Sequence, residues 1–165
     1  MGGRRGGGER RWCTGTCRRG RRIVWPDDET PPDRAAAHVK LLLDTCTFLW
    51  LSGAGPLSSA AAEAIATPAN EVYLSAASVW EVVTKYQRGR LALPEPPDQL
   101  IPTERRLRGL MPLPFDEESA LQGVRLPWWH RDPFDRMLIS QAIAHGLAIV
   151  TPDPLIKQYP VRVIW

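Results

Sequence analysis

Apolar and polar residues alternate in blocks from about residue 39 to the end of the chain. Five blocks are short, nearly continuous apolar runs, which are typical of strands buried on both faces of a parallel sheet. These runs are VKLLLD (39–44), EVYLS (71–75), LMPLP (110–114), LAIVT (147–151) and VRVIW (161–165). We predict one strand in each run.

The blocks between these runs carry helix signals, namely capping residues, terminal glycines and apolar residues at helical spacing. They predict helices over residues 45–53, 57–66, 75–89, 96–109, 116–123 and 132–146. We expect the helix within 96–109 to be interrupted at Pro102, because an interior proline removes a backbone hydrogen bond. In the helix over 75–89, the apolar stripe that should face the core is Val79, Val82, Val83 and Tyr86.

Strands that alternate with helices indicate an α/β domain with a parallel sheet and right-handed crossovers. We expect this domain to span residues 39–165. Residues 1–38 are rich in Gly, Arg and Pro and show neither helical nor strand periodicity, so we predict a disordered extension. Either this extension binds RNA non-specifically, or it results from a start codon of the gene that is assigned too far upstream. We favour the second explanation.

Charge is divided unevenly between these two parts of the chain. Residues 1–39 hold nine Arg and five acidic residues, whereas residues 40–165 hold twelve basic and thirteen acidic residues. The folded part is therefore not a basic domain of the kind that grips nucleic acid by charge alone. The sequence lacks a secretory signal pattern and an apolar run of transmembrane length, so we expect a cytoplasmic protein without membrane association.

Carboxylates lie where the predicted strands end. Asp44 closes the first strand, and Asp153 comes two residues after the strand LAIVT. Glu81 lies about two turns into the helix that follows EVYLS, and Asp132 and Asp135 open the helix before LAIVT. Ligands of open α/β sheets gather beyond the carboxyl ends of the strands. We therefore expect these acids to converge at one edge of the sheet.

Each of these acids also has a purely structural explanation. Asp44 and Asp132 can cap helices, and Asp135 can favour a helix start through the helix dipole. Glu81 can pair with the lysine one turn later on the solvent side, and Asp153 can close a turn. Together these explanations are weaker, because all five acids fall near the same predicted edge.

A group of carboxylates without cysteine or histidine ligands suits a hard divalent cation such as Mg²⁺ or Mn²⁺. Without a cation the carboxylates would repel one another. The chemistry that fits such a site is phosphodiester hydrolysis, in which a metal polarises phosphoryl oxygens and activates water.

Four stretches occur in an order that resembles a known family. They are LLLDTCTFLW, LSAASVWEVVTKYQRGRL, HRDPFDRMLISQAIAHGLAIVTPD and VRVIW. Together they resemble bacterial PIN domains of the kind found in the toxins of VapBC toxin–antitoxin pairs. The resemblance spans about residues 40–165. It rests on the order of an Asp after the first strand, S-x-W-E, H-x-D-P-x-D-R and T-x-D, each of which is weak alone.

The resemblance implies a magnesium- or manganese-dependent endoribonuclease with a three-layer α/β/α fold around a central, mostly parallel sheet. It implies an acidic site, both catalytic and metal-binding, formed by Asp44, Glu81, Asp135 and Asp153. Asp132 belongs to the branch of the family with the D-P-x-D-R motif and is a candidate accessory residue. Two further accessory candidates have structural alternatives: His130 can act as an acid–base group or contact phosphate, although we favour a hydrogen-bonded structural histidine, and Thr151 can bond a metal-bound water or simply end the strand. The resemblance further implies an RNA substrate, a small antitoxin protein as partner and a homodimer, and it leaves open whether one or two metal ions bind.

Aromatic and basic residues next to the predicted site have two interpretations. Trp128 and Trp129 can stack on RNA bases, although core or dimer contacts explain them more simply. Arg131 and Arg136 can contact phosphate, or they can be solvated or paired within the protein.

Other families fit the sequence less well. A haloacid-dehalogenase-type phosphatase needs D-x-D after the first strand, where this chain has Asp44 and then Cys46. A phosphoacceptor receiver domain needs paired acids at that position, and only one is present. The non-enzymatic alternative is a PIN-like scaffold that binds RNA or protein, and it applies if the acids do not converge or bind no metal.

Overall fold

The computed structural model describes residues 13–16, 22–25, 38–53 and 55–165. The chain forms two compact units, Met1–Ala37 and His38–Trp165. In the first unit, strands β1 (Cys13–Thr16) and β2 (Arg22–Trp25) pair antiparallel. The sequence did not predict these two strands. Most of residues 1–38 lies outside the described ranges, so the disorder expected there stays a prediction.

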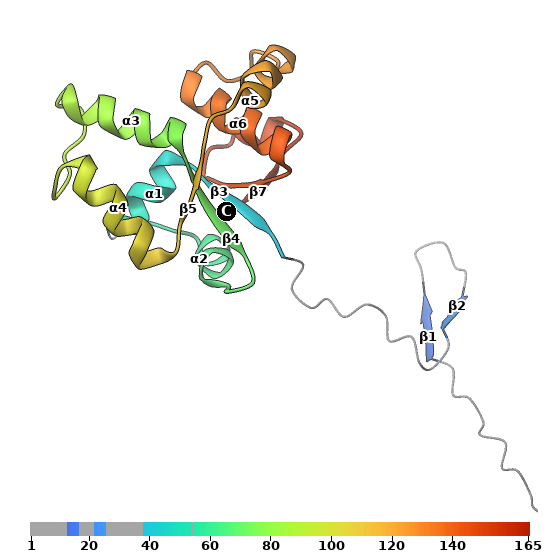
Figure 1. Cartoon of the computed structure of the whole chain (residues 1–165). Coiled ribbons are helices and arrows are strands. Elements are labelled where there is room, and N and C mark those ends of the chain that lie inside the picture. The colour runs from blue at the N-terminus through green and yellow to red at the C-terminus, as the bar shows by residue number, and fades with distance from the viewer. Residues whose placement is uncertain (1–12, 17–21, 26–37, 54) are drawn as a thin grey trace, which may run out of the picture. The chain divides into compact units, whose positions relative to one another are not determined.

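The second unit is built on a five-stranded parallel sheet with the strand order β5–β4–β3–β6–β7 (Figure 1). The strands are β3 (Lys40–Leu43), β4 (Glu71–Ser75), β5 (Met111–Leu113), β6 (Ala148–Val150) and β7 (Arg162–Ile164). In the central strand β3, Leu41 lies opposite Val72 on one side and Ala148 on the other. The five predicted strands are confirmed. Because the strands are parallel, their carboxyl ends share one edge, which we call the carboxyl edge.

Helices connect these strands and cover the sheet. The helices and 3₁₀ turns of the second unit are α1 (Thr45–Ser52), α2 (Ser59–Ala66), α3 (Ala76–Gln87), α4 (Pro97–Arg108), α5 (Glu117–Gln122), η1 (Gly123–Arg125), α6 (Pro133–His145) and η2 (Ile156–Gln158). Figure 1 shows α1, α3 and α4 on one side of the sheet and α5 and α6 on the other. Within the described ranges, every helix is too short or too polar to cross a membrane.

Both faces of the sheet carry a hydrophobic core. On β3, Leu41 and Leu43 belong to a core that includes Phe48 of α1, whereas Leu42 belongs to a second core that includes Leu138 of α6. All five side chains are fully buried. Successive strand residues point to opposite faces, so one apolar run supplies both cores. The predicted three-layer α/β/α architecture is confirmed.

Helix α4 continues through Pro102, and the predicted interruption is wrong. Pro102 lies on the exposed side of the helix, while its neighbour Ile101 and the earlier Leu100 are buried. Burial of the inner face holds the helix together, and solvent can bond to the carbonyl that loses its partner.

Helix α3 is rotated relative to the face that the valine stripe predicted. Its buried residues are Ala77, Ser78, Glu81 and Val82, whereas Tyr86 is exposed. The helix packs against α1, α4 and α6, so burial on several sides outweighs the apolar stripe. As a consequence, an acidic side chain faces inward.

Candidate active site

Asp44 follows the central strand β3 at the carboxyl edge and is only 6% exposed. Its backbone N–H donates to the Val150 carbonyl at the end of β6 (3.2 Å). The hydroxyl of the buried Thr151 donates to Asp44 Oδ2 (2.6 Å). The Cys46 thiol also donates to this oxygen (3.2 Å), and burial together with the Asp44 charge raises the pKa of the thiol to about 12. Two neighbouring strand ends thus fix the Asp44 carboxylate.

Glu81 reaches the same edge from helix α3 and is 5% exposed. The Thr45 hydroxyl, one residue after Asp44, donates to Glu81 Oε2 (2.6 Å). Lys85 forms an ion pair with Glu81 Oε1, and this hydrogen bond raises the pKa of Lys85. The i,i+4 pair considered from the sequence therefore exists. Its acid is buried at the edge of the sheet, however, and not on the solvent side.

The start of α6 carries two aspartates with different roles. Asp132 is the N-cap residue, and its exposed side chain accepts a hydrogen bond from the Phe134 backbone N–H (2.8 Å). Asp135 lies in the first turn, and its side chain is 20% exposed. Burial and the charge of Asp44 raise the pKa of Asp135 to about 7, although His130 acts in the opposite direction. Asp132 therefore caps the helix, and Asp135 belongs to the acidic cluster.

His130 connects two of these acids. Its Nε2 lies 2.9 Å from Asp153 Oδ2 and 3.3 Å from Asp135 Oδ2. Its Nδ1 accepts the Asp132 backbone N–H (3.2 Å), which assigns the ring proton to Nε2. The imidazole therefore donates toward the carboxylates. One ligand atom each from His130, Asp135 and Asp153 lies within 4.8 Å of the others.

Asp153 lies beyond the end of β6 and has a double role. Its Oδ1 accepts the Leu155 backbone N–H (2.7 Å), which closes a local turn. Its own N–H donates to Thr151 Oγ1 (3.1 Å). Because Thr151 also donates to Asp44, a single hydroxyl links these two acids.

The structure brings the four predicted site acids, Asp44, Glu81, Asp135 and Asp153, together at the carboxyl edge. Asp44 and Glu81 contribute to the raised pKa of Asp135, and His130 joins Asp135 to Asp153. Thr151 and His130, predicted as accessory residues, both contact the cluster. The exposed Asp132 caps α6, and its charge helps to raise the pKa of Asp135.

The composition of this cluster fits a hard divalent cation. The available ligands are carboxylate oxygens, which suit magnesium or manganese. Burial and then repulsion from Asp44, Asp132 and Glu81 raise the pKa of Asp135, so the ionised carboxylate is disfavoured in the protein alone. A bound cation would remove this repulsion.

Sequence reasoning missed Thr45 and left the role of Arg136 open. Thr45 carries no recognisable signal beyond its place after Asp44. Arg136 was considered for phosphate binding, but its guanidinium donates to the backbone carbonyls of Pro127 (2.7 Å), Leu126 (3.2 Å), Gly123 (3.4 Å) and His130 (3.4 Å). Arg136 therefore holds the segment before α6 in place. Arg131, in contrast, is exposed.

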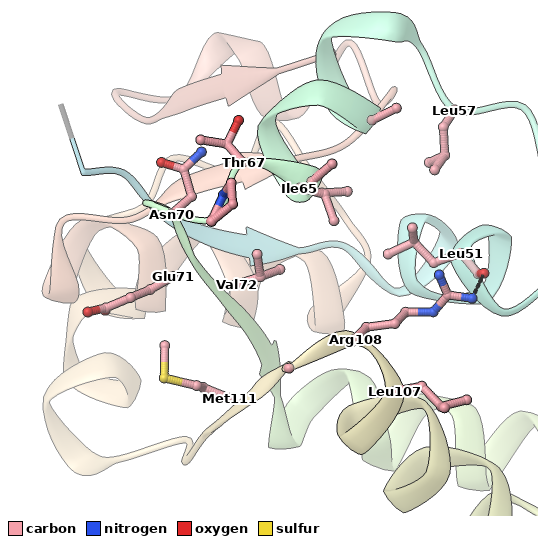
Figure 2. Close-up of a pocket in the computed structure, with 14 residues that line it drawn as sticks. Leu51, Leu57, Ile65, Thr67, Asn70, Glu71, Val72, Leu107, Arg108 and Met111 are labelled. Atoms are coloured by element: carbon pink, nitrogen blue, oxygen red, sulfur yellow. Dashed lines mark hydrogen bonds between the residues drawn. The ribbon is translucent and has the colours of Figure 1, made fainter. Parts of the chain in front are cut away.

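A pocket of about 570 Å³ lies at the opposite edge of the sheet (Figure 2). It is lined by Glu71 and Val72 at the start of β4, by Met111 at the start of β5, and by residues of α2 and α4 that include Ile65 and Leu107. None of the clustered acids lines it. This pocket is therefore separate from the acidic site.

Comparisons with known proteins identify the family of this domain. The family model described as "PIN domain" matches residues 41–161. Over 47 residues the chain is 43% identical to Ribonuclease VapC16 of Mycobacterium tuberculosis (strain ATCC 25618 / H37Rv). That match covers 28% of this chain and 33% of the relative, so it spans only about a third of the relative's length.

Two solved structures have the same fold. VapBC2 from Rickettsia felis, bound to a DNA fragment from its promoter, matches with a TM-score of 0.60 and 17% identity, over 76% of this chain and 97% of that chain. DNA-bound VapBC from Salmonella typhimurium matches with a TM-score of 0.54 and 19% identity, over 76% and 96%. The family match extends from the central strand β3 almost to β7 and includes all four clustered acids. The chain belongs to the PIN domain family.

Proposed function

We propose that this protein is a divalent-metal-dependent endoribonuclease and the toxin of a type II toxin–antitoxin pair. The observation that carries the proposal is the convergence of four carboxylates at the carboxyl edge, where burial and the neighbouring acids raise the pKa of Asp135. Membership of the PIN family and the similarity to a protein named Ribonuclease VapC16 support ribonucleic acid as the substrate.

In this proposal Asp44, Glu81, Asp135 and Asp153 hold Mg²⁺ or Mn²⁺. The ion would polarise the phosphoryl oxygens and lower the pKa of bound water, so that hydroxide is available near neutral pH. Four acids are more than one ion requires, which is compatible with either one or two ions.

The surrounding residues orient these acids. Thr151 fixes Asp44 through its hydroxyl and also accepts the Asp153 N–H. Thr45 and Lys85 each bond to one Glu81 oxygen, and these two contacts fix the direction of the carboxylate. Each of these contacts reduces the freedom of a ligand before the substrate arrives, and such preorganisation is a main source of catalytic power.

The proposed toxin role is supported by the assemblies in which the similar structures occur. Both solved structures cited above are VapBC complexes, and we propose that this chain likewise binds a small antitoxin protein and forms a homodimer. A cationic antitoxin side chain entering the acidic cluster would block it, since opposite charges attract most strongly where water is excluded.

Cleavage of total RNA in the presence of Mg²⁺, Mn²⁺ or a chelator tests the proposal. We expect cleavage with either metal, none with chelator, and none from Asp44→Asn. The matched control Glu118→Gln removes an exposed acid on α5 and should cleave normally. If the unaltered protein binds RNA but leaves it intact with both metals, the chain is a binding scaffold and the nuclease proposal is wrong.

A further inference from the structure

Two neighbouring tryptophans are exposed beside the acidic site. Trp128 is 79% exposed and Trp129 is 51% exposed, in the turn that leads to His130. Their interpretation as core residues is therefore wrong. Exposed indoles next to each other form an apolar surface that water solvates poorly, and such surfaces mark binding sites more often than chance.

The Trp128 ring is held in place from one side. The Arg136 guanidinium lies over it, with the carbon Cζ 4.0 Å from the ring centroid. Arg136 cannot move freely, because it also donates to the carbonyls of Pro127 and Leu126. One face of the indole thus rests on a fixed cation, and the high exposure of the side chain leaves the other face open.

The Trp129 ring is anchored separately. It packs against Tyr159 with a centroid distance of 5.1 Å and an interplanar angle of 60°. The Tyr159 hydroxyl accepts the His130 backbone N–H (2.7 Å) and donates to the Pro127 carbonyl (3.0 Å). These bonds tie the turn to the segment between η2 and β7. Both indoles are therefore presented by a preorganised backbone, which lowers the entropy cost of binding.

The two tryptophans come directly before a residue that contacts the clustered acids. His130 follows Trp129 and contacts both Asp135 and Asp153. The next residue, Arg131, is exposed. Consecutive Cα atoms are about 3.8 Å apart, so aromatic faces, a basic side chain and the acidic cluster fall within a few residues' length.

Resting on the proposed nuclease function, we propose that Trp128 and Trp129 form a stacking platform for the bases of single-stranded RNA that flank the phosphate at the acidic site. Arg131 is placed to meet the backbone of the same strand. Stacking on an indole accepts any base, because every base has a π face. The platform would position the substrate without reading its sequence.

The charge of the domain favours this role for the tryptophans. Residues 40–165 carry one more acidic than basic residue, and the clustered carboxylates repel a polyanion. Binding of RNA here cannot rely on counter-charge alone, as it does on strongly basic domains. Stacking is not weakened by that repulsion, and it therefore supplies attraction where the electrostatic contribution is poor.

Equilibrium binding of fluorescent probes tests the platform. In the presence of Ca²⁺, the full chain is titrated against an oligoadenylate of about 12 nucleotides and against an abasic ribose-phosphate probe of equal length. Both probes are checked to be intact after the titration. We expect Trp128→Ala to weaken binding of the oligoadenylate at least about fivefold and to leave the abasic probe unchanged. Trp128→Phe should retain most of the affinity, because it keeps a π face.

Leu107→Ala is the matched control, since Leu107 is a 74% exposed apolar residue at the opposite edge of the sheet (Figure 2). It should change neither affinity. Equal losses for both probes, or no loss for the oligoadenylate, would overturn the platform. Unchanged RNA binding with an altered oligomeric mass in light scattering would also overturn it and assign the surface to protein contacts.

The binding assay does not depend on cleavage. Base-dependent binding without metal-dependent cleavage would retain the platform and reject the nuclease. Cleavage with unchanged binding in Trp128→Ala would do the reverse. The two proposals can therefore fail separately.

Discussion

Replacing Asp135 with asparagine should stabilise the metal-free protein, although it removes a charge that favours a helix start. In the folded protein, burial and the charges of Asp44, Asp132 and Glu81 act against the ionised Asp135 carboxylate. Asparagine has the same shape without the charge. The substitution therefore removes repulsion at the cost of one favourable interaction with the helix dipole.

The magnitude follows from the pKa of Asp135, which is raised from 3.8 to about 7. At about 1.4 kcal/mol for each pKa unit, a shift of roughly three units sets an upper limit near 4 kcal/mol. Solvent that reaches the exposed fifth of the side chain screens part of this repulsion. The lost dipole interaction subtracts about 0.3–1 kcal/mol. We expect a net gain of about 1–2 kcal/mol at pH 8.

The gain should depend on pH with a defined sign. The folded protein retains a proton that the unfolded chain releases, so Asp135 contributes most to stability below about pH 4. That contribution is lost as the pH rises through about 7. Asparagine does not titrate. The free energy of unfolding of Asp135→Asn relative to the unaltered protein should therefore increase between pH 4 and 7 and then level off.

Urea denaturation in chelator at several pH values measures this difference. Asp116→Asn is a control of opposite sign, because hydrogen bonds from Ser119 lower the pKa of the exposed Asp116 carboxylate. The contribution of Asp116 is present above about pH 4 and is lost as the pH falls. If Asp135→Asn is equally destabilising at pH 5 and pH 8, the repulsion is absent and Asp135 serves only the helix.

Three further substitutions test the contacts around the site. Thr151→Val should lower metal-dependent cleavage at least about tenfold, because Asp44 loses its hydroxyl partner, and should lower the free energy of unfolding by about 1 kcal/mol. Thr151→Ser keeps the hydroxyl and should cleave nearly normally. Lys85→Ala should cost about 1–2 kcal/mol in urea denaturation, since Glu81 stays buried without its cation, and an unchanged midpoint would contradict this. Arg136→Ala should cost about 2 kcal/mol by removing donors from four carbonyls, whereas equal stability would show that solvent replaces them.

The sequence predicted the features that depend on local pattern. The apolar run around Leu42 is long enough to be a buried strand, and parallel order then places Asp44 and Asp153 at one edge. The N-cap at Asp132 follows from its place before a proline, and Gly146 adopts the left-handed conformation (φ 65°) at which α6 ends. Each of these inferences needs only a few neighbouring residues.

The sequence could not predict features that depend on distant packing. The valine stripe of α3 indicated that Glu81 points away from the core, yet contacts with α1, α4 and α6 bury it. The sequence left open whether Arg136 contacts phosphate or pairs within the protein, because its partners are backbone carbonyls whose positions depend on the path of the turn. The exposure of Trp128 depends on that same path.

The start of α6 explains why a structural and a catalytic reading of its aspartates both looked reasonable. A helix N-terminus attracts negative charge, so Asp132 and Asp135 suit the helix whether or not a metal binds. The difference lies in their surroundings. Asp132 is exposed and bonds to its own helix, whereas Asp135 faces other acids and has a raised pKa that a helix dipole alone would not produce. A carboxylate kept in a repulsive position is unfavourable for the fold, and a bound cation is the simplest compensation for it.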